Sequence, residues 1–173
     1  MYHSNIKPKL EEHHKDCFGW ALYCCDQDKE MSYEVLQNSY LKMLERQNTF
    51  KGKAEFKTWA FAIIKNTAID ALRKRNKEFR IIQSENNIPD AYYDARFESE
   101  FDQKLKKLFF SEALNQLSDR QRQIMQLVFY HDLSLNQSAE VLNLSPGSVR
   151  KYYDRAKKVL TDWFQKRGIA ELY

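Results

Sequence analysis

The sequence predicts an all-α protein, built as two small helical domains joined by a flexible linker. Only 4 glycines and 3 prolines occur among its 173 residues, which argues against the many turns of a β-rich fold. Apolar residues recur at helical spacing over long stretches, and an acidic segment without that spacing separates two basic regions. We therefore expect domains at 1–80 and 104–173, with the linker at 81–103.

Three helices are expected in the first domain, over residues 10–25, 31–47 and 54–75. The middle helix has one apolar stripe, formed by Val35, Leu36, Tyr40, Met43 and Leu44. Its other faces carry polar residues, among them Glu34, Gln37 and Asn38. That polar side is available to a partner.

The cysteines Cys17, Cys24 and Cys25 lie close to His13 and His14 in the sequence, so a metal site has to be considered. Their spacing fits no established metal motif, and small buried cysteines are the favoured interpretation. An odd number of cysteines gives no support to a disulfide framework. A metal-dependent enzyme built on His13, His14, Cys17 and Cys24 is a competing hypothesis, but no carboxylate or base is spaced to complete its site.

Charge is distributed unevenly along the chain, whose net charge is +4. Six basic residues lie between positions 65 and 80, and six acidic residues against one arginine lie between positions 85 and 102. The acidic stretch has little helical periodicity and is expected to be the linker. No apolar run is long enough to span a membrane and no secretion signal is evident, so we expect a soluble, cytoplasmic protein without membrane insertion.

The second domain is expected to hold four helices. The first covers 104–115, and the second covers 119–129 with a capping box formed by Ser118 and Gln121. The third and fourth lie in the segment 133–160 and read as a helix-turn-helix, the second helix of which is strongly basic. The domain therefore has the outline of a DNA-reading unit.

The starts of both helices of this motif are specified locally. Ser134 and Gln137 form a capping box, while Ser145 followed by Pro146 supplies an N-cap and a first-turn proline. Three further positions carry suitable residues: Ala139 where the helices touch, Asn143 at a turn requiring positive φ, and Val149 early in the second helix.

The last helix separates its faces. Its packing side is formed by Val149, Tyr153, Ala156, Leu160 and Trp163, and its other side by Arg150, Lys151, Asp154, Arg155 and Lys158. Between positions 145 and 167 seven residues are basic and two are acidic, which suits a phosphate-lined groove. A solvated face of an ordinary helix bundle is the alternative, and the paired caps and turn chemistry weigh against it.

The order of these parts resembles the extracytoplasmic-function group of the sigma-70 family of bacterial transcription initiation factors. Residues 33–45 are similar to the family's helix that binds core RNA polymerase, residues 50–75 to its minus-ten segment, and residues 117–160 to its fourth region. Three motifs in the right order, split by a linker, are more specific than any one of them.

The resemblance implies a role for particular residues of the first domain. Glu34, Gln37 and Asn38 are expected to face core polymerase, with Asn38 standing where a second acidic residue is usual. A sigma factor must also hold melted DNA, which needs apolar walls, polar groups for base edges and cations for the backbone. The corresponding residues are Phe50, Lys51, Lys53, Lys65 and Asn66, with Phe50 and Asn66 in the pocket for a flipped base. Phe56 and Trp59 are interpreted as core aromatics rather than stacking platforms.

In the second domain the resemblance implies that the last helix reads the minus-thirty-five element. Arg150, Lys151, Asp154 and Arg155 fall on the reading positions. Arginine can bind a guanine edge with two hydrogen bonds, and aspartate can accept one from cytosine. Asp154 needs a base or an Arg155 partner, because phosphates repel it.

The sequence thus predicts a promoter-specificity subunit that is not itself an enzyme and needs no cofactor or metal. Its expected partners are core RNA polymerase and promoter DNA, and an anti-sigma factor is a further candidate. The acidic linker is expected to thread through the nucleic-acid channels of the polymerase. A stand-alone helix-turn-helix regulator with an N-terminal sensor bundle is the competing hypothesis.

Overall fold

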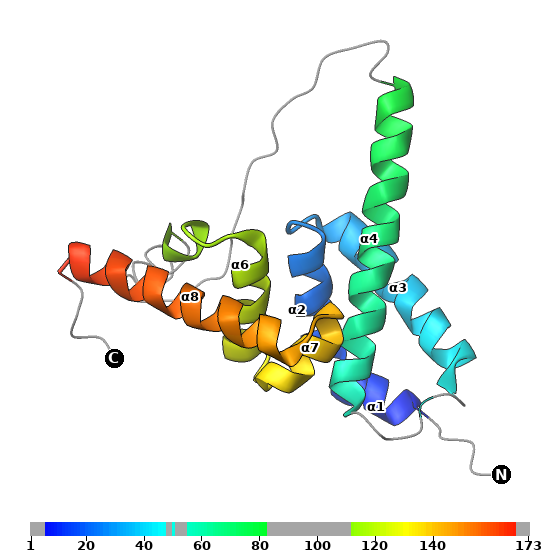
Figure 1. Cartoon of the computed structure of the whole chain (residues 1–173). Helices are drawn as coiled ribbons and strands as arrows, with labels where there is room; N and C mark the ends of the chain where they lie inside the picture. The colour runs from blue at the N-terminus through cyan, green and yellow to red at the C-terminus, as the bar shows by residue number, and fades with distance from the viewer. Residues whose placement is uncertain (1–5, 48–49, 51–54, 83–111, 169–173) are drawn as a thin grey trace, which may run out of the picture. The chain divides into compact units, whose positions relative to one another are not determined.

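The computed structural model describes residues 6–47, 50, 55–82 and 112–168, and the side chains of 78–82 are left aside. Its elements are helices, and no strand occurs among the described residues. The chain divides into two compact units within 1–93 and 94–173 (Figure 1). The predicted all-α fold with two helical regions is confirmed, while most of the predicted linker lies outside the described residues.

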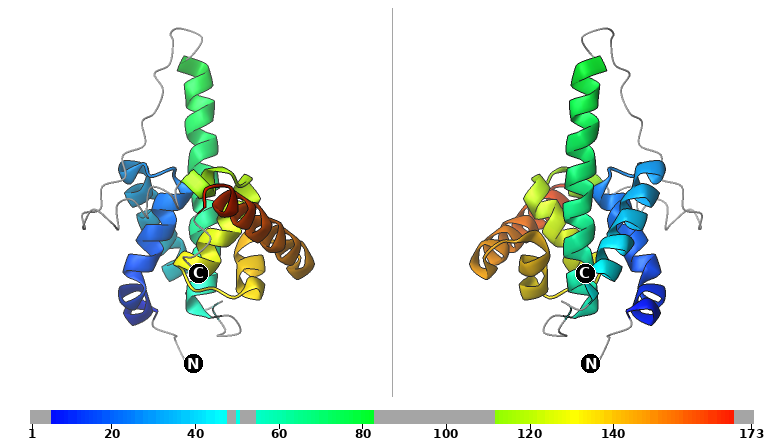
Figure 2. Two further views of the ribbon diagram at one scale, coloured as in Figure 1. Left: turned by 90° about the vertical axis from the view of Figure 1, so that its left-hand side faces the viewer. Right: turned by 90° about the vertical axis from the view of Figure 1, so that its right-hand side faces the viewer.

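The described residues of the first unit form four helices: α1 (Lys7–Glu12), α2 (His14–Cys24), α3 (Lys29–Glu45) and α4 (Phe56–Ile82). Helices α2, α3 and α4 pack against one another pairwise, and α1 contacts α2. The C-terminal part of α4 extends past α2 and α3, as the two views in Figure 2 show. Arg73, Lys74 and Lys77, in the C-terminal half of α4, are exposed to solvent.

Trp20 of α2 lies at the centre of this unit. It is 1% exposed, its indole Nε1 donates to the backbone oxygen of Phe61 at 3.1 Å, and its ring stacks on that of Phe61 at 5.5 Å. Val35 and Met43 of α3 are fully buried as well. The indole therefore buries a large apolar surface and satisfies its one polar atom at the same time.

Asp28 joins two helices of the first unit, α3 and α4. Its carboxylate accepts from the backbone nitrogen of Met31 at 3.0 Å and so caps α3, and it accepts from Arg75 Nη1 of α4 at 2.8 Å. The turn before it carries two non-glycine residues of positive φ, Asp26 at 51° and Gln27 at 64°. A short, strained turn is thus held by a cap and an ion pair.

Several helix boundaries of the first unit differ from the sequence prediction, and α3 covers Lys29–Glu45 rather than 31–47. The helix expected over 10–25 is broken at His13 into α1 and α2, and the ring of His13 stacks on Phe56 with a centroid distance of 5.6 Å. A tertiary contact therefore overrides the helical periodicity. Helix α4 starts at Phe56 rather than at 54 and continues to Ile82 rather than ending at 75, so the basic stretch 65–80 is helical.

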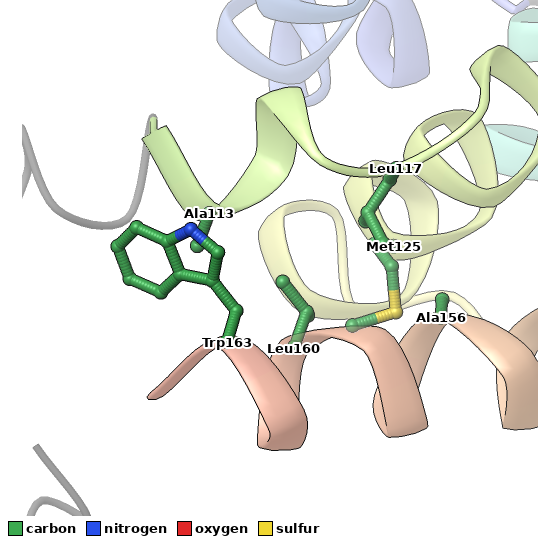
Figure 3. Packing of buried hydrophobic residues seen from close by; sticks show 6 residues of the cluster. All are labelled: Ala113, Leu117, Met125, Ala156, Leu160 and Trp163. Carbon is green, nitrogen blue, oxygen red and sulfur yellow. The ribbon is translucent and has the colours of Figure 1, made fainter. Parts of the chain in front are cut away.

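The second unit contains α6 (Asp119–Met125), the π-helix η2 (Gln126–Tyr130), α7 (Leu135–Leu142) and α8 (Pro146–Lys166). Residues 112–115 form the described end of the helix expected at 104–115. This end packs against α8. The core between them is formed by Ala113, Leu117, Met125, Ala156, Leu160 and Trp163 (Figure 3).

The expected helix 119–129 widens at its end into η2, where the backbone nitrogen of His131 donates to the oxygen of Gln126 at 3.3 Å. Such an extra residue in one turn changes which side chains point inward. Leu127 and His131 are buried at 0% and 1% exposure, while Phe129 and Tyr130 are 57% and 67% exposed. No feature of the sequence analysis predicted this bulge.

The helix-turn-helix has the predicted local geometry. Gln137 Oε1 accepts from the Ser134 nitrogen at 2.7 Å, Ser134 Oγ accepts from the Gln137 nitrogen at 3.2 Å, and both bonds of the capping box are formed. Ser145 Oγ accepts from the Ser148 nitrogen at 3.1 Å, with Pro146 in the first turn of α8. Asn143 adopts φ 52° and ψ 50°, the left-handed conformation expected for the turn.

We expect Asn143→Ala to lower the free energy of unfolding of the second unit by about 1 kcal/mol, because a left-handed backbone is costly for alanine. Asn143→Gly should stay within about 0.5 kcal/mol of the parent, since glycine reaches this conformation freely. Hydrogen exchange of peptides from α7 and α8 measures the difference. Equal protection of the alanine and parent proteins would contradict the argument.

Candidate nucleic-acid and protein interfaces

Helix α8 presents one charged face opposite its core face. Arg150, Lys151, Asp154, Arg155 and Lys158 are all exposed, and at about 100° per residue they share one side of the helix. Val149 and Ala156 on the other side are fully buried. The predicted reading residues therefore lie together on a surface that packing leaves open.

Asp154 has a partner on this face, but not the one considered from the sequence. Its Oδ1 lies 3.3 Å from Nζ of Lys157, and the same ammonium lies 4.6 Å from the ring centroid of Tyr153. Both members of the ion pair are more than half exposed, so the pair is weak and open to exchange with another ligand. The other four charged residues of the face make no ion pair with any residue that the structure describes.

A second polar surface follows one side of α4. Trp59, Asn66 and Arg73 are spaced by seven residues and so lie on one side of the helix. Asn66 and Arg73 are exposed, whereas Lys65 is half-buried. Ile69 lies between Asn66 and Arg73 along the helix and is 41% exposed. It is an apolar side chain on a polar face, and the sequence analysis did not single it out.

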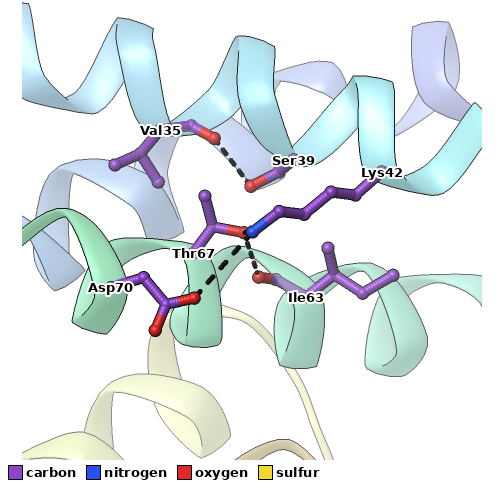
Figure 4. Close-up of polar contacts among 6 residues, drawn as sticks. All are labelled: Val35, Ser39, Lys42, Ile63, Thr67 and Asp70. Atoms are coloured by element: carbon purple, nitrogen blue, oxygen red, sulfur yellow. Dashed lines mark hydrogen bonds and ion pairs between the residues drawn. The ribbon is translucent and has the colours of Figure 1, made fainter.

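Several basic residues of the first unit are engaged by contacts inside it. Arg75 is bonded to Asp28, and Lys42 Nζ donates to Thr67 Oγ1 at 3.2 Å and lies 4.0 Å from Asp70 (Figure 4). Thr67 in turn donates to the oxygen of Ile63 at 2.9 Å. These contacts form a polar seam between α3 and α4. In it the ammonium of Lys42 offsets the charge of Asp70, which lies one turn along α4 from Asn66.

Phe50 lies against the start of α4. Its ring centroid is 5.7 Å from that of Phe56 in an edge arrangement and 5.0 Å from that of Trp59. Phe56 is 5% exposed, which confirms its core role, while Phe50 and Trp59 are half-buried. Lys51 and Lys53, predicted to bind the same DNA segment, lie outside the described residues.

The exposed side of α3 contains the polar residues predicted for it. Glu34, Gln37 and Asn38 are all exposed. Tyr33 and Leu41 beside them are 54% and 58% exposed, and the Tyr33 ring stacks on Phe18 at 4.8 Å. Both apolar residues fall outside the stripe predicted for the core, and that departure was the available signal of a partner surface.

The cysteines lie in or beside the core of the first unit. Cys17 and Cys25 are buried, as predicted, and Cys24 is half-buried. Burial raises the pKa of Cys17 to about 12 and also raises the pKa of Cys24 and Cys25. A raised pKa disfavours the thiolate that binds metals or attacks substrates.

The neighbouring histidines have separate contacts. His14 Nδ1 lies 3.0 Å from the hydroxyl of Tyr40, whose pKa burial raises, and His13 stacks on Phe56. Within the described ranges, no three His, Cys, Asp or Glu side chains are arranged to hold a metal ion. None of the described helices combines the length and apolarity needed to cross a membrane.

Comparison with known families gives two matches in chain order. The family model for Sigma-70 region 2 matches residues 10–78, and that for Sigma-70 region 4 matches residues 110–160. The first match covers the unit with the α3 and α4 surfaces, and the second covers the helix-turn-helix.

Individual proteins give the same result. RNA polymerase sigma factor SigV of Bacillus subtilis is 29% identical over 168 residues, 93% of this chain and 92% of its own length. ECF RNA polymerase sigma factor SigX of the same organism is 24% identical over 161 residues, 87% of this chain and 78% of its own. The solved sigma factor RpoE from Bartonella quintana, in complex with the anti-sigma factor NepR, has a TM-score of 0.69 and 22% identity, covering 93% of this chain and 97% of RpoE.

Proposed function

Because the chain belongs to the sigma-70 family, as an extracytoplasmic-function RNA polymerase sigma factor, we propose that its surfaces divide the contacts with polymerase and promoter DNA. The unit within 1–80 binds core polymerase and the minus-ten element, and the unit within 104–173 binds the minus-thirty-five element. The acidic segment 81–103 passes through the nucleic-acid channels of the polymerase. The observation that supports this most strongly is the open, charged face of α8 on a fully capped helix-turn-helix.

The charged face of α8 reads the upstream element. Arg150 and Lys151 lie in the first turns after the N-terminus of α8, where a recognition helix reaches base edges. Arg155 is one turn further on, and Lys158 is placed to contact a phosphate. Asp154 is held by Lys157 and exchanges that partner for a cytosine amine at the groove floor.

The side of α4 holds the melted strand. Phe50, supported by Trp59, provides an aromatic wall for a flipped base, and Asn66 provides hydrogen bonds to its edge. Lys65, Lys51 and Lys53 neutralise the backbone. Ile69 adds an apolar contact between Asn66 and Arg73 that suits an unstacked base.

The exposed side of α3 binds core polymerase. Tyr33 and Leu41 supply the apolar area that dominates protein interfaces, and Glu34, Gln37 and Asn38 form a polar rim around it. The seam of Lys42, Thr67 and Asp70 links this helix to α4, so the polymerase-binding and DNA-binding surfaces of the unit share one rigid support.

We further propose that an anti-sigma factor is a third partner. The RpoE structure and that of CnrH, which has a TM-score of 0.60 and 18% identity, are complexes with the anti-sigma factor NepR and the cytosolic domain of CnrY. Sigma factors are in general DNA-binding regulators without enzymatic activity, and we assign none to this chain. Its place of action is the cytoplasm, where polymerase and chromosome meet.

Core-dependent promoter binding tests the function. With core polymerase the protein should retain promoter fragments and support run-off transcription, and without core it should bind the same duplex much more weakly. A panel of genomic promoter fragments, assayed with and without core, measures both. Tight, specific duplex binding by the protein alone, with no transcription on adding core, would favour the stand-alone regulator instead.

Arg150→Ala should weaken recognition of the upstream element by about 1–3 kcal/mol and relax the base preference at one position. The reason is loss of the bidentate contact to a guanine edge. Arg120→Ala is the matched control, since Arg120 is an exposed arginine on α6 of the same unit. Holoenzyme binding to promoters with single substitutions measures both effects, and an unchanged base preference would remove Arg150 from the reading face.

Asn66→Ala should leave core binding intact and reduce open-complex formation roughly fivefold, corresponding to about 1 kcal/mol for a lost hydrogen bond to a base. Asn76→Ala is the control, because Asn76 is exposed on α4 and lies ten residues, about 15 Å, further along the helix from Asn66. Permanganate reactivity of promoter thymines measures melting. Equal melting by the two variants would take Asn66 out of the pocket.

A further inference from the structure

The short helix α1 contacts the aromatic residues at the start of α4. Its Lys9 places the ammonium over the ring of Phe50, 5.2 Å from the centroid, and 5.9 Å from the centroid of Phe56. Both distances are within the range of a cation–π interaction. A residue 41 positions earlier in the sequence therefore touches the aromatic wall that we assign to the melted strand.

The position of Lys9 is set by its neighbours in α1 and at the N-cap of α1. Ile6 and Leu10 are 0% and 8% exposed, so they anchor the helix in the core. Directly after α1, the His13 ring stacks on Phe56 at 5.6 Å. Lys9 itself is exposed, and its long side chain could extend into water, yet it lies along the aromatic cluster.

Phe50 needs such support because it belongs to no helix. It lies in the connection between α3 and α4, and the contacts described for its ring are those with Lys9, Phe56 and Trp59. A side chain ordered before binding loses less conformational freedom when the ligand arrives. A cation held on its face therefore favours one fixed position of the ring.

We propose that Lys9 is a positioning residue for capture of the melted strand, which it supports by holding the Phe50 ring in place. The proposal rests on the function proposed above for Phe50. In this proposal α1 takes part in binding the minus-ten element, in addition to covering the core of the first unit. No residue of α1 was among those implicated by the sequence.

The test uses full-length protein with core polymerase on an artificial bubble template, in which the minus-ten region is already single-stranded. Lys9→Met keeps the aliphatic stem and removes the charge, and it should weaken retention of the bubble about two- to fivefold. Lys9→Arg should restore retention, since guanidinium also binds ring faces. Lys15→Met is the matched control, because Lys15 is an exposed lysine of α2 with no described ring contact.

Two further measurements separate positioning from a structural role. Affinity for core polymerase and the thermal midpoint should be the same for Lys9→Met and Lys15→Met. If Lys9→Met also lowers these, or if it retains the bubble as well as Lys15→Met does, Lys9 has no positioning role.

A double-mutant cycle with Phe50→Ala separates this inference from the function it rests on. In the Phe50→Ala background, Lys9→Met should have no further effect on retention. A full effect there would mean that Lys9 contacts DNA directly and would overturn the positioning role. If Phe50→Ala itself leaves retention unchanged, the proposed function of Phe50 fails, and the inference fails with it.

Discussion

Burial of one side of a long helix organises each unit, α4 in the first and α8 in the second. Ala60, Phe61, Ile64 and Ala68 of α4 are buried against α2 and α3, and α8 is buried through Val149, Ala156, Leu160 and Trp163. The opposite sides of both helices remain open and carry polar residues. Each candidate DNA surface is therefore the solvent side of a helix whose other side is fixed by packing, which keeps the reading residues in a defined register.

Polar contacts then decide which of the available charges remain free. Six basic residues between positions 65 and 80 are equivalent in the sequence, but Arg75 is bonded to the N-cap of α3 and Lys65 is half-buried. On α8, Lys157 is paired with Asp154, while Arg150 and Arg155 are exposed. Counting charges along the chain thus overestimates the surface available to phosphates.

Features set by neighbouring residues could be predicted from the sequence, and features set by distant contacts could not. The two caps and the left-handed Asn143 were predictable because each depends on residues within one turn. The break at His13 depends on Phe56, and the contact of Lys9 depends on Phe50, so neither has a local signal. The exposure of the charged α8 face could be predicted from the helical periodicity of the sequence. The exposure of Leu41 and Ile69 could have been predicted only by noting that these apolar residues fall outside the core stripes of their helices.

The Asp154–Lys157 ion pair bears on the electrostatics of the proposed promoter binding. The opposite charges of Asp154 and Lys157 cancel in the net charge of this side of α8, so the proposed reading face has the net charge of Arg150, Lys151, Arg155 and Lys158. Neutralising about four phosphates releases condensed counterions, so affinity should fall with roughly the third to fourth power of salt concentration. A face with so few uncompensated cations gains little binding free energy from contacts with the phosphates of non-specific duplex DNA. Discrimination between promoters then depends more on base edges than on bulk charge attraction.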